Sequence, residues 1–179
     1  MARLNVVTEG QSEESFVRVV LAPYLGRFDI FAVARSVETS RKHATIVRGG
    51  LKTYEKAKRD IVRWLTQDKS AYVSTLFDLY GLPADFPVLA ASGAAGPRDR
   101  VRELEETFRQ AINNPRFIPY IQLHEFEGLL FSDINAIDSE LALIDKQSQL
   151  QKLAAIRADV ASPELIDDGY DTCPSRRLA

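Results

Sequence analysis

The sequence predicts an α/β domain in which helices flank a small, mainly parallel sheet. Short apolar segments rich in β-branched residues alternate along the chain with longer amphipathic segments of helical period. The length of 179 residues fits one domain, and 45% hydrophobic with 27% charged residues is an ordinary globular composition. We therefore expect residues 1–179 to form a single domain.

Four segments have the composition and length of β-strands. They are residues 4–8, 28–33, 72–77 and 117–123. The third is the strongest candidate because it is rich in aromatic and β-branched residues. Pro119 lies inside the fourth and has no N–H for a strand ladder, so we expect that strand at a sheet edge.

Helices are predicted between and after these strands. Ser12 is expected to cap the first helix, with Glu13 and Glu14 in the first turn, where the helix dipole favours anions. This helix should end before Pro23 or continue to Leu25. The remaining predicted helices span residues 54–65, 98–113, 125–131 and 147–160, and Ser162 is expected to cap a further turn.

Charge is nearly balanced overall but unevenly distributed. The chain has 23 Lys and Arg against 25 Asp and Glu, which argues against nucleic-acid binding through bulk positive charge. Residues 35–63 nevertheless contain nine basic and three acidic residues, whereas residues 121–171 contain three and eleven. Such asymmetry can mark two different surfaces, although we favour a solvated helix face for residues 52–63.

Residues 35–50 show no clean period and end in two glycines. We predict a flexible basic loop here. Its side chains Arg41, Lys42 and Arg48 are the candidate contacts to nucleic-acid phosphates.

The single cysteine, Cys173, cannot form an internal disulfide, which fits a reducing compartment. No apolar run approaches the roughly 20 residues that span a membrane, and the N-terminal apolar run is too short for a signal peptide. We expect a cytoplasmic protein without membrane association.

Carboxylates follow three of the four predicted strands. Glu9 follows the first, Asp78 ends the third, and Glu125 and Glu127 follow the fourth. In parallel sheets, sites form beyond the carboxyl ends of the strands. Each acid alone is better explained as a helix cap or a solvated turn. Together they favour a site, because converging carboxylates need a proton or a cation such as Mg²⁺ or Mn²⁺.

Other kinds of site are poorly supported. Two histidines and one cysteine are too few for a His/Cys zinc site. The sequence has no Walker-type loop, no GxGxxG and no GxSxG motif. His124 lies next to apolar Leu123 and Phe126, so a hydrogen-bonded structural role is favoured over a catalytic one.

Several motifs resemble a known family. Residues 7–17 (VTEGQSEESFV) resemble the EGxTE opening of Toprim-like domains, and residues 75–83 (TLFDLYGLP) resemble their central acidic strand. With residues 120–133 and 162–178, nearly the whole chain resembles a bacterial domain-of-unknown-function family, DUF4276, with a Toprim-like core. The resemblance implies a small parallel sheet between helices. It also implies that the domain continues beyond Ala179, so that the chain is a fragment.

The Toprim superfamily includes topoisomerases, primases, RNA-maturation nucleases and overcoming-lysogenization-defect nucleases, which use an acidic Mg²⁺ centre for phosphodiester chemistry. By this resemblance Glu9 is a metal ligand or general acid/base and Asp78 a metal ligand. Tyr80 occupies the position of the second aspartate of the Asp-x-Asp pair, so Glu125 or Glu127 would have to replace it. Gly10, Glu13 and His124 are supporting candidates.

The sequence and the resemblance therefore support two candidate functions. The first is a Mg²⁺- or Mn²⁺-dependent nuclease, since 179 residues cannot hold the additional modules of a topoisomerase or a primase. The resemblance also implies a role in phage defence together with an ATPase encoded nearby. The second is a non-catalytic Toprim-like module that binds an ATPase partner or nucleic acid, which the absent second aspartate favours.

Overall fold

The computed structural model describes residues 1–42, 45–48, 51–87, 96–145, 147–166 and 173–178. The side chains of residues 38–42, 45–48 and 145 lie outside this description. The chain divides into two compact units, Met1–Ile121 and Gln122–Ala179, a division that the sequence did not predict. Within the described residues, none of the helices has the length and apolar character needed to cross a membrane.

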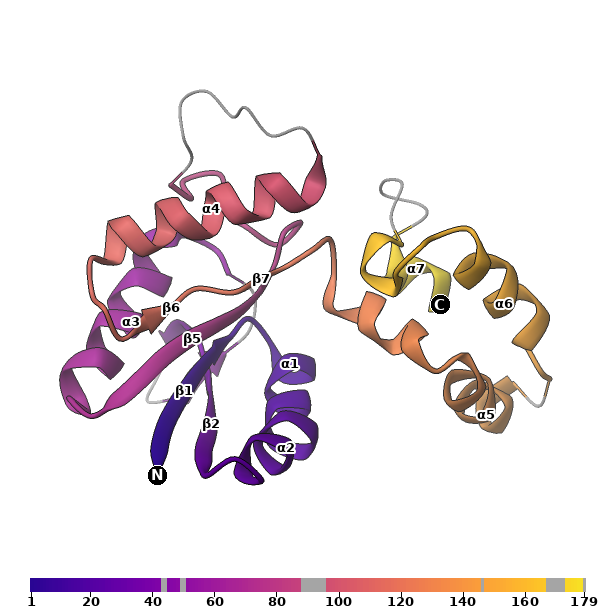
Figure 1. The fold of residues 1–179 in the computed structure, drawn as a ribbon, viewed down its shortest axis with the longest axis horizontal. Helices are drawn as coiled ribbons and strands as arrows, with labels where there is room; N and C mark the ends of the chain where they lie inside the picture. Colours follow the sequence, from indigo (N-terminus) through magenta and orange to yellow (C-terminus); the bar gives the residue numbers. More distant parts are fainter. Residues whose placement is uncertain (43–44, 49–50, 88–95, 146, 167–172, 179) are drawn as a thin grey trace. The chain divides into compact units, whose positions relative to one another are not determined.

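The first unit is built on a mainly parallel sheet (Figure 1). In the described part of the chain its strand order is β2-β1-β5-β6, and β7 pairs with β5. β1 runs parallel to β2 and to β5, and β5 runs parallel to β6. This sheet confirms the predicted α/β class. The strands are β1 (Ala2–Thr8), β2 (Ile30–Ser36), β5 (Ala71–Asp78), β6 (Phe117–Ile118) and β7 (Ile121–Gln122).

The connections place helices on both sides of this sheet. The chain passes from β1 to the neighbouring strand β2 through a continuous helical segment, residues 11–26. It then passes from β2 through α3 to β5, which lies on the other side of β1. The two steps run in opposite directions, so right-handed connections put their helices on opposite faces. The helices of this unit are α1 (Gln11–Phe16), the π-helical η1 (Val17–Leu21), α2 (Ala22–Gly26), α3 (Tyr54–Gln67) and α4 (Pro97–Ile112).

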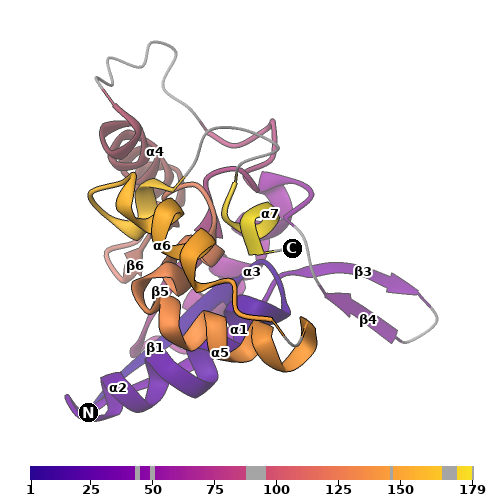
Figure 2. The same cartoon turned by 90° about the vertical axis from the view of Figure 1, so that its right-hand side faces the viewer.

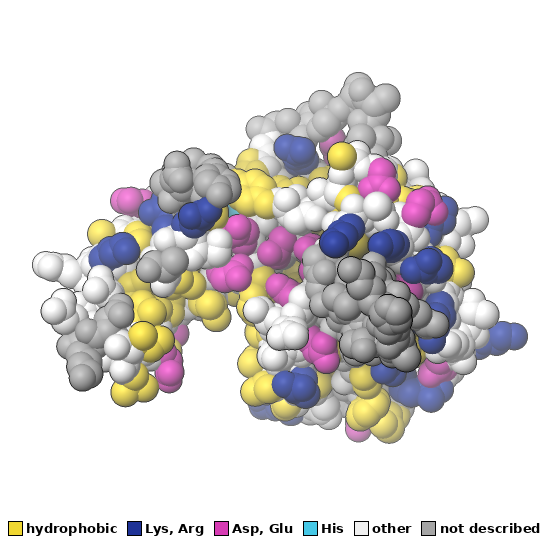
Figure 3. All heavy atoms as spheres, turned by 180° about the vertical axis from the view of Figure 1, so that it is seen from behind, with side chains coloured by type: hydrophobic (Ala, Val, Ile, Leu, Met, Phe, Trp, Pro, Cys, Tyr) yellow, Lys and Arg dark blue, Asp and Glu magenta, His cyan; other side chains and the backbone are white. Residues whose placement is uncertain are grey.

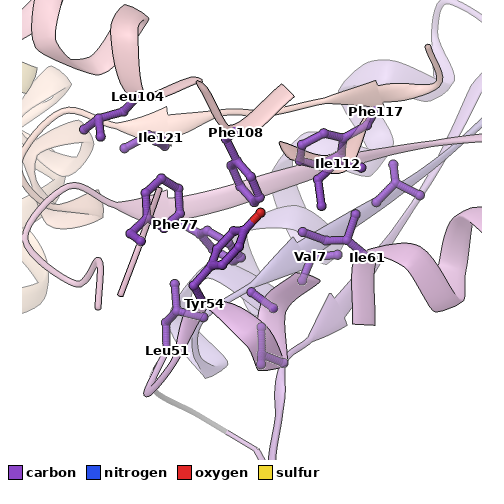
Figure 4. Packing of buried hydrophobic residues seen from close by; sticks show 14 of the residues in the cluster. Val7, Leu51, Tyr54, Ile61, Phe77, Leu104, Phe108, Ile112, Phe117 and Ile121 are labelled. Atoms are coloured by element: carbon purple, nitrogen blue, oxygen red, sulfur yellow. The ribbon is translucent and has the colours of Figure 1, made fainter. Parts of the chain in front are cut away.

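The main core of the first unit lies between α3, α4 and the sheet (Figure 4). Val7 and Phe77 from the strands and Phe108 from α4 are completely buried. The ring of Phe108 packs edge-on against Phe117 with centroids 4.8 Å apart. Apolar residues at helical spacing are buried in both helices: Ala57, Ile61, Leu65, Leu104, Phe108 and Ile112. Trp64 and Val101, which continue the same apolar faces, are only partly buried.

Residues 35–50 differ from the sequence prediction. β2 extends to Ser36, and β3 (Glu38–Lys42) pairs antiparallel with β4 (Thr45–Arg48). The expectation of an irregular loop is therefore wrong for these strands, whose mixed charged and β-branched sequence has no apolar alternation to reveal a hairpin. Figure 2 shows the hairpin extending away from the sheet of this unit. The side chains of Arg41, Lys42 and Arg48 lie outside the described residues.

Two helix predictions also need correction. The first helix is capped by Gly10 and not by Ser12, because the chain is already helical from Gln11. In the second unit, α5 (Ile134–Asp145) was not predicted, although Asp133 caps it by accepting hydrogen bonds from the N–H groups of Asn135 and Ala136 at 3.1 Å.

The second unit contains short helices around its own small core. Phe131, Leu153 and Ile166 are buried together there. The segment predicted as a helix after residue 125 is instead a 3-10 helix, η2. The elements are η2 (Phe126–Ser132), α5, α6 (Leu150–Ala158), η3 (Pro163–Leu165) and α7 (Pro174–Leu178).

The Arg116 guanidinium hydrogen-bonds to backbone carbonyls at the end of α3 and at the start of β5. Its Nη1 donates to the carbonyls of Asp68 and Ala71 at 2.8 Å, and its Nη2 donates to the carbonyl of Leu65 at 2.7 Å. Because Arg116→Ala leaves these carbonyls without the guanidinium, we expect it to lower the free energy of unfolding by about 2–4 kcal/mol. Urea denaturation checks this prediction, with exposed Arg109→Ala as the control, and an equal loss in both variants would contradict it.

Candidate active site

The Glu9 carboxylate joins the carboxyl ends of two neighbouring strands. Glu9 directly follows β1, and its Oε1 accepts a hydrogen bond of 2.8 Å from the backbone N–H of Asp78, the last residue of β5. Because β1 and β5 are parallel and adjacent, both ends lie at the same edge of the sheet. The structure thus brings together Glu9 and Asp78, 69 residues apart in sequence.

Gly81 provides the space for this carboxylate. Its N–H donates to the carbonyl of Asp78 at 3.0 Å, which closes a turn after β5. A Cβ atom at Gly81 would lie 2.5 Å from Oε2 and 3.0 Å from Oε1 of Glu9. A side chain at this position would therefore displace the carboxylate. Sequence reasoning marked Gly81 only as a turn residue and missed this role.

Burial controls the charge state of Glu9. Desolvation raises the pKa of its carboxyl to about 7 from the ordinary value of 4.5, against the lowering effect of the Asp78 N–H. The nearby charge of Glu13 raises this pKa further. Glu13 itself is held by the backbone N–H of Gly10, which donates to its Oε2 at 2.9 Å. Gly10 and Glu13, two of the predicted supporting residues, therefore lie beside Glu9.

This pKa makes folding stability depend on pH. Between about pH 4.5 and pH 7 the folded protein keeps the Glu9 proton that the unfolded chain has lost, so the free energy of unfolding falls as pH rises. One pKa unit corresponds to about 1.4 kcal/mol, and for this partly buried group we expect a total loss on the order of 2 kcal/mol. Urea denaturation in metal-free buffer should show this fall, and Glu9→Gln should remove it. An unchanged pH dependence in the variant would contradict the prediction.

A second polar group lies at the same edge, where β1 and β2 end. The Ser36 hydroxyl donates to Oε2 of Glu14, and the Thr8 hydroxyl lies 3.4 Å from the Ser36 hydroxyl. These contacts fix α1 to the end of β2. Glu14 and Ser36 were not among the predicted site residues, because the sequence gives no sign that residues 22 apart meet.

The other predicted residues of the first unit have clear positions. Asp78 is partly buried at the end of β5. Tyr80, in the turn that follows, is 48% exposed and supplies no carboxylate. Among the residues that the structure describes, no group of three or more His, Cys, Asp or Glu is arranged to hold a metal ion.

Glu125, Glu127 and His124 belong to the second unit. Oε2 of Glu125 accepts a hydrogen bond of 3.0 Å from the backbone N–H of Ser175, so this carboxylate ties the start of η2 to the start of α7. Glu127 is partly buried in the first turn of η2. His124 is buried with a left-handed backbone (φ 62°). A shared metal site for Glu9, Asp78 and Glu125 or Glu127 stays a prediction.

Glu9 and Asp78 would supply at most a sparse set of ligands for a Mg²⁺ or Mn²⁺ ion at the sheet edge. Mg²⁺ commonly uses one or two carboxylates and takes its other ligands from water and substrate phosphate. Glu9 and Asp78 offer hard oxygen donors from adjacent strand ends. The raised pKa of Glu9 shows that its negative charge lacks sufficient stabilisation from the protein, which a cation would supply.

Comparison with known families supports the resemblance to DUF4276. A family model described as Domain of unknown function (DUF4276) matches residues 8–179. The chain belongs to this family. The DUF4276 match covers almost all of both units, and Glu9, Asp78, Glu125 and Glu127 all lie within it. No curated protein and no solved structure matches the chain.

Proposed function

We propose that this DUF4276 protein is a Toprim-type nuclease that hydrolyses phosphodiester bonds with the help of Mg²⁺ or Mn²⁺. The observation that carries the proposal is the partly buried Glu9 carboxylate, which has a pKa of about 7 and lies at the carboxyl edge of a parallel sheet beside Asp78. A carboxylate with this pKa exchanges protons readily at neutral pH, which is what a general acid/base requires. The resemblance of residues 7–17 and 75–83 to Toprim motifs supports the same chemistry.

Each residue has a defined role in this proposal. Glu9 accepts a proton from the attacking water through Oε2, because Oε1 is occupied by the Asp78 N–H. Glu9 and Asp78 would hold the metal ion, and the residues of the Gly81 turn keep the Glu9 carboxylate in place. The ion, when bound, would stabilise negative charge on the phosphate and orient water. Glu125 or Glu127 would complete the ligand set.

A cleavage assay tests the proposal. The full chain is incubated with labelled duplex DNA, single-stranded DNA and single-stranded RNA, in Mg²⁺, in Mn²⁺ and in EDTA. We expect cleavage of at least one substrate with metal and none in EDTA. Because the resemblance implies an ATPase partner in phage defence, the assay is repeated with the ATPase encoded nearby. Absence of cleavage under all these conditions would reject the nuclease proposal.

The second candidate is a non-catalytic module that binds an ATPase or nucleic acid. Tyr80 at the position of the second Toprim aspartate favours it, because a tyrosine cannot replace a carboxylate as a metal ligand in this chemistry. In that case the protein should bind nucleic acid or the ATPase equally well in Mg²⁺ and in EDTA, and no substrate should be cut.

A further inference from the structure

A basic strip lies on the first unit, on the exposed side of α3. Lys56, Arg59 and Arg63 are spaced three and four residues apart, so they line up along one side of the helix. Arg59 and Arg63 are exposed, and Lys56 is partly buried. Nε of Arg59 lies 4.0 Å from Oδ1 of Asp60, whose side chain is only 7% exposed. Glu55, one turn before Arg59, is exposed, so three cations and one accessible acid share this part of α3.

Arg35 of β2 extends this strip through Trp64. Its guanidinium carbon lies 4.3 Å from the centre of the Trp64 ring, and that of Arg63 lies 5.6 Å from the same centre. Nε of Arg35 also donates to Oδ1 of Asn5 at 3.2 Å, which fixes its stem on the sheet. Two elements distant in sequence thus place their arginines on one aromatic ring. We call Arg35, Lys56, Arg59 and Arg63 the α3 strip.

The strip and the proposed site belong to the same unit, with the strip on the face of the sheet that α3 covers. Arg35 immediately precedes Ser36, which hydrogen-bonds Glu14 at the sheet edge. α3 also packs against β3 of the hairpin. Figure 3 shows Lys and Arg side chains gathered on one face of the first unit. The strip therefore lies on the same unit as Glu9 and next to the end of β2.

We propose that the α3 strip binds the phosphate backbone of a nucleic acid and so positions it on the first unit. Lys56 and Arg63 are seven residues apart, or about 10 Å along a helix, a length over which one DNA strand presents about three phosphates. Three of the four cations are arginines, whose planar fork matches phosphate oxygens. This inference deepens the proposed function and rests on its substrate being a nucleic acid.

The test compares two charge-matched double variants. Arg59→Gln/Arg63→Gln removes two cations from the strip, whereas the control Arg18→Gln/Arg27→Gln removes two exposed arginines from the helical segment between β1 and β2. Binding of labelled duplex DNA, single-stranded DNA and single-stranded RNA is measured by fluorescence anisotropy in EDTA, over a range of salt concentrations. EDTA prevents metal-dependent cleavage, so this experiment measures binding by the strip independently of catalysis.

We expect the strip variant to lose on the order of tenfold in affinity and, on duplex DNA, to lower the slope of log K against log salt by about two. The control should keep the wild-type slope. Arg59→Lys/Arg63→Lys should also keep it, since the charges remain. If the double variant does not fold, Lys56→Gln tests the same strip with an expected slope change of about one.

Two outcomes would overturn the proposal. The first is a strip variant with the wild-type affinity and salt slope on each nucleic acid. The second is wild-type protein that binds none of the three probes at low salt but binds poly-glutamate through the strip, which would identify an acidic protein as the partner.

Discussion

Glu9→Gln should reduce metal-dependent cleavage by at least a hundredfold without unfolding the protein. The variant keeps the size of the side chain and its carbonyl oxygen, which can still accept the hydrogen bond from the Asp78 N–H. It loses the proton-accepting oxygen and the charge that a cation requires. Loss of a group that acts in the transition state commonly costs on the order of a hundredfold or more in rate. Single-turnover cleavage with the best substrate measures this effect.

Although Glu9→Gln should lose activity, it should be more stable than the wild type in metal-free buffer. At pH 8 wild-type Glu9 is ionised although it is partly buried beside Glu13, so its replacement by a neutral amide should raise the melting temperature in metal-free buffer. Added Mg²⁺ at about ten times its Kd should stabilise the wild type by about 1.4 kcal/mol and leave Glu9→Gln unchanged. Asp78→Asn should likewise lose the metal response and cleavage.

These measurements distinguish an error about metal binding from an error about the role of Glu9. Wild-type protein without a thermal shift in Mg²⁺ or Mn²⁺ would refute metal binding. A Glu9→Gln variant that cuts at the wild-type rate would refute only the role given to Glu9.

Gly81→Ala should reduce cleavage by roughly tenfold to a hundredfold while the protein remains folded. The new Cβ would lie 2.5 Å from Oε2 of Glu9, so the carboxylate has to move. Displacement of a catalytic group by about 1 Å can cost on the order of a hundredfold. The atom that moves is the end of a side chain, so the free energy of unfolding should change by less than about 1 kcal/mol.

The pH dependence of folding stability is a second measurement of the displacement of Glu9 in Gly81→Ala. Once displaced, the carboxylate becomes more solvated, and its pKa should fall toward the ordinary value of 4.5. The decline of stability between pH 4.5 and pH 7 should then become smaller in Gly81→Ala. Gly26→Ala is the matched control because a Cβ there meets nothing within 4 Å. Equal cleavage rates in both variants would show that the turn does not position Glu9.

Local patterns predicted most elements of the first unit. Aromatic and β-branched residues such as Val73 and Phe77 indicated strand β5. Ala57, Ile61 and Leu65 recur at helical spacing and form the buried side of α3. Periodicity is a reliable signal for α3 and α4 because each buries one of its faces. The inner strands β1 and β5 bury consecutive residues, so composition indicated them better than period.

The hairpin β3–β4 was missed because it has no clear apolar period. Helix α5 was missed although Ile134, Ile137 and Leu141 recur at helical spacing and pack against the core of the second unit.

The order of strands and helices along the chain was enough to predict the α/β class and the mainly parallel sheet, and it put Glu9 and Asp78 at strand ends. That these two ends belong to adjacent strands and meet follows only from the tertiary structure. The tertiary structure alone decided the properties of that pair. The raised pKa of Glu9 depends on burial and on the nearby charge of Glu13. The need for glycine at position 81 depends on an approach between segments 72 residues apart. Burial and close approach are properties of packed surfaces, and local sequence does not encode them.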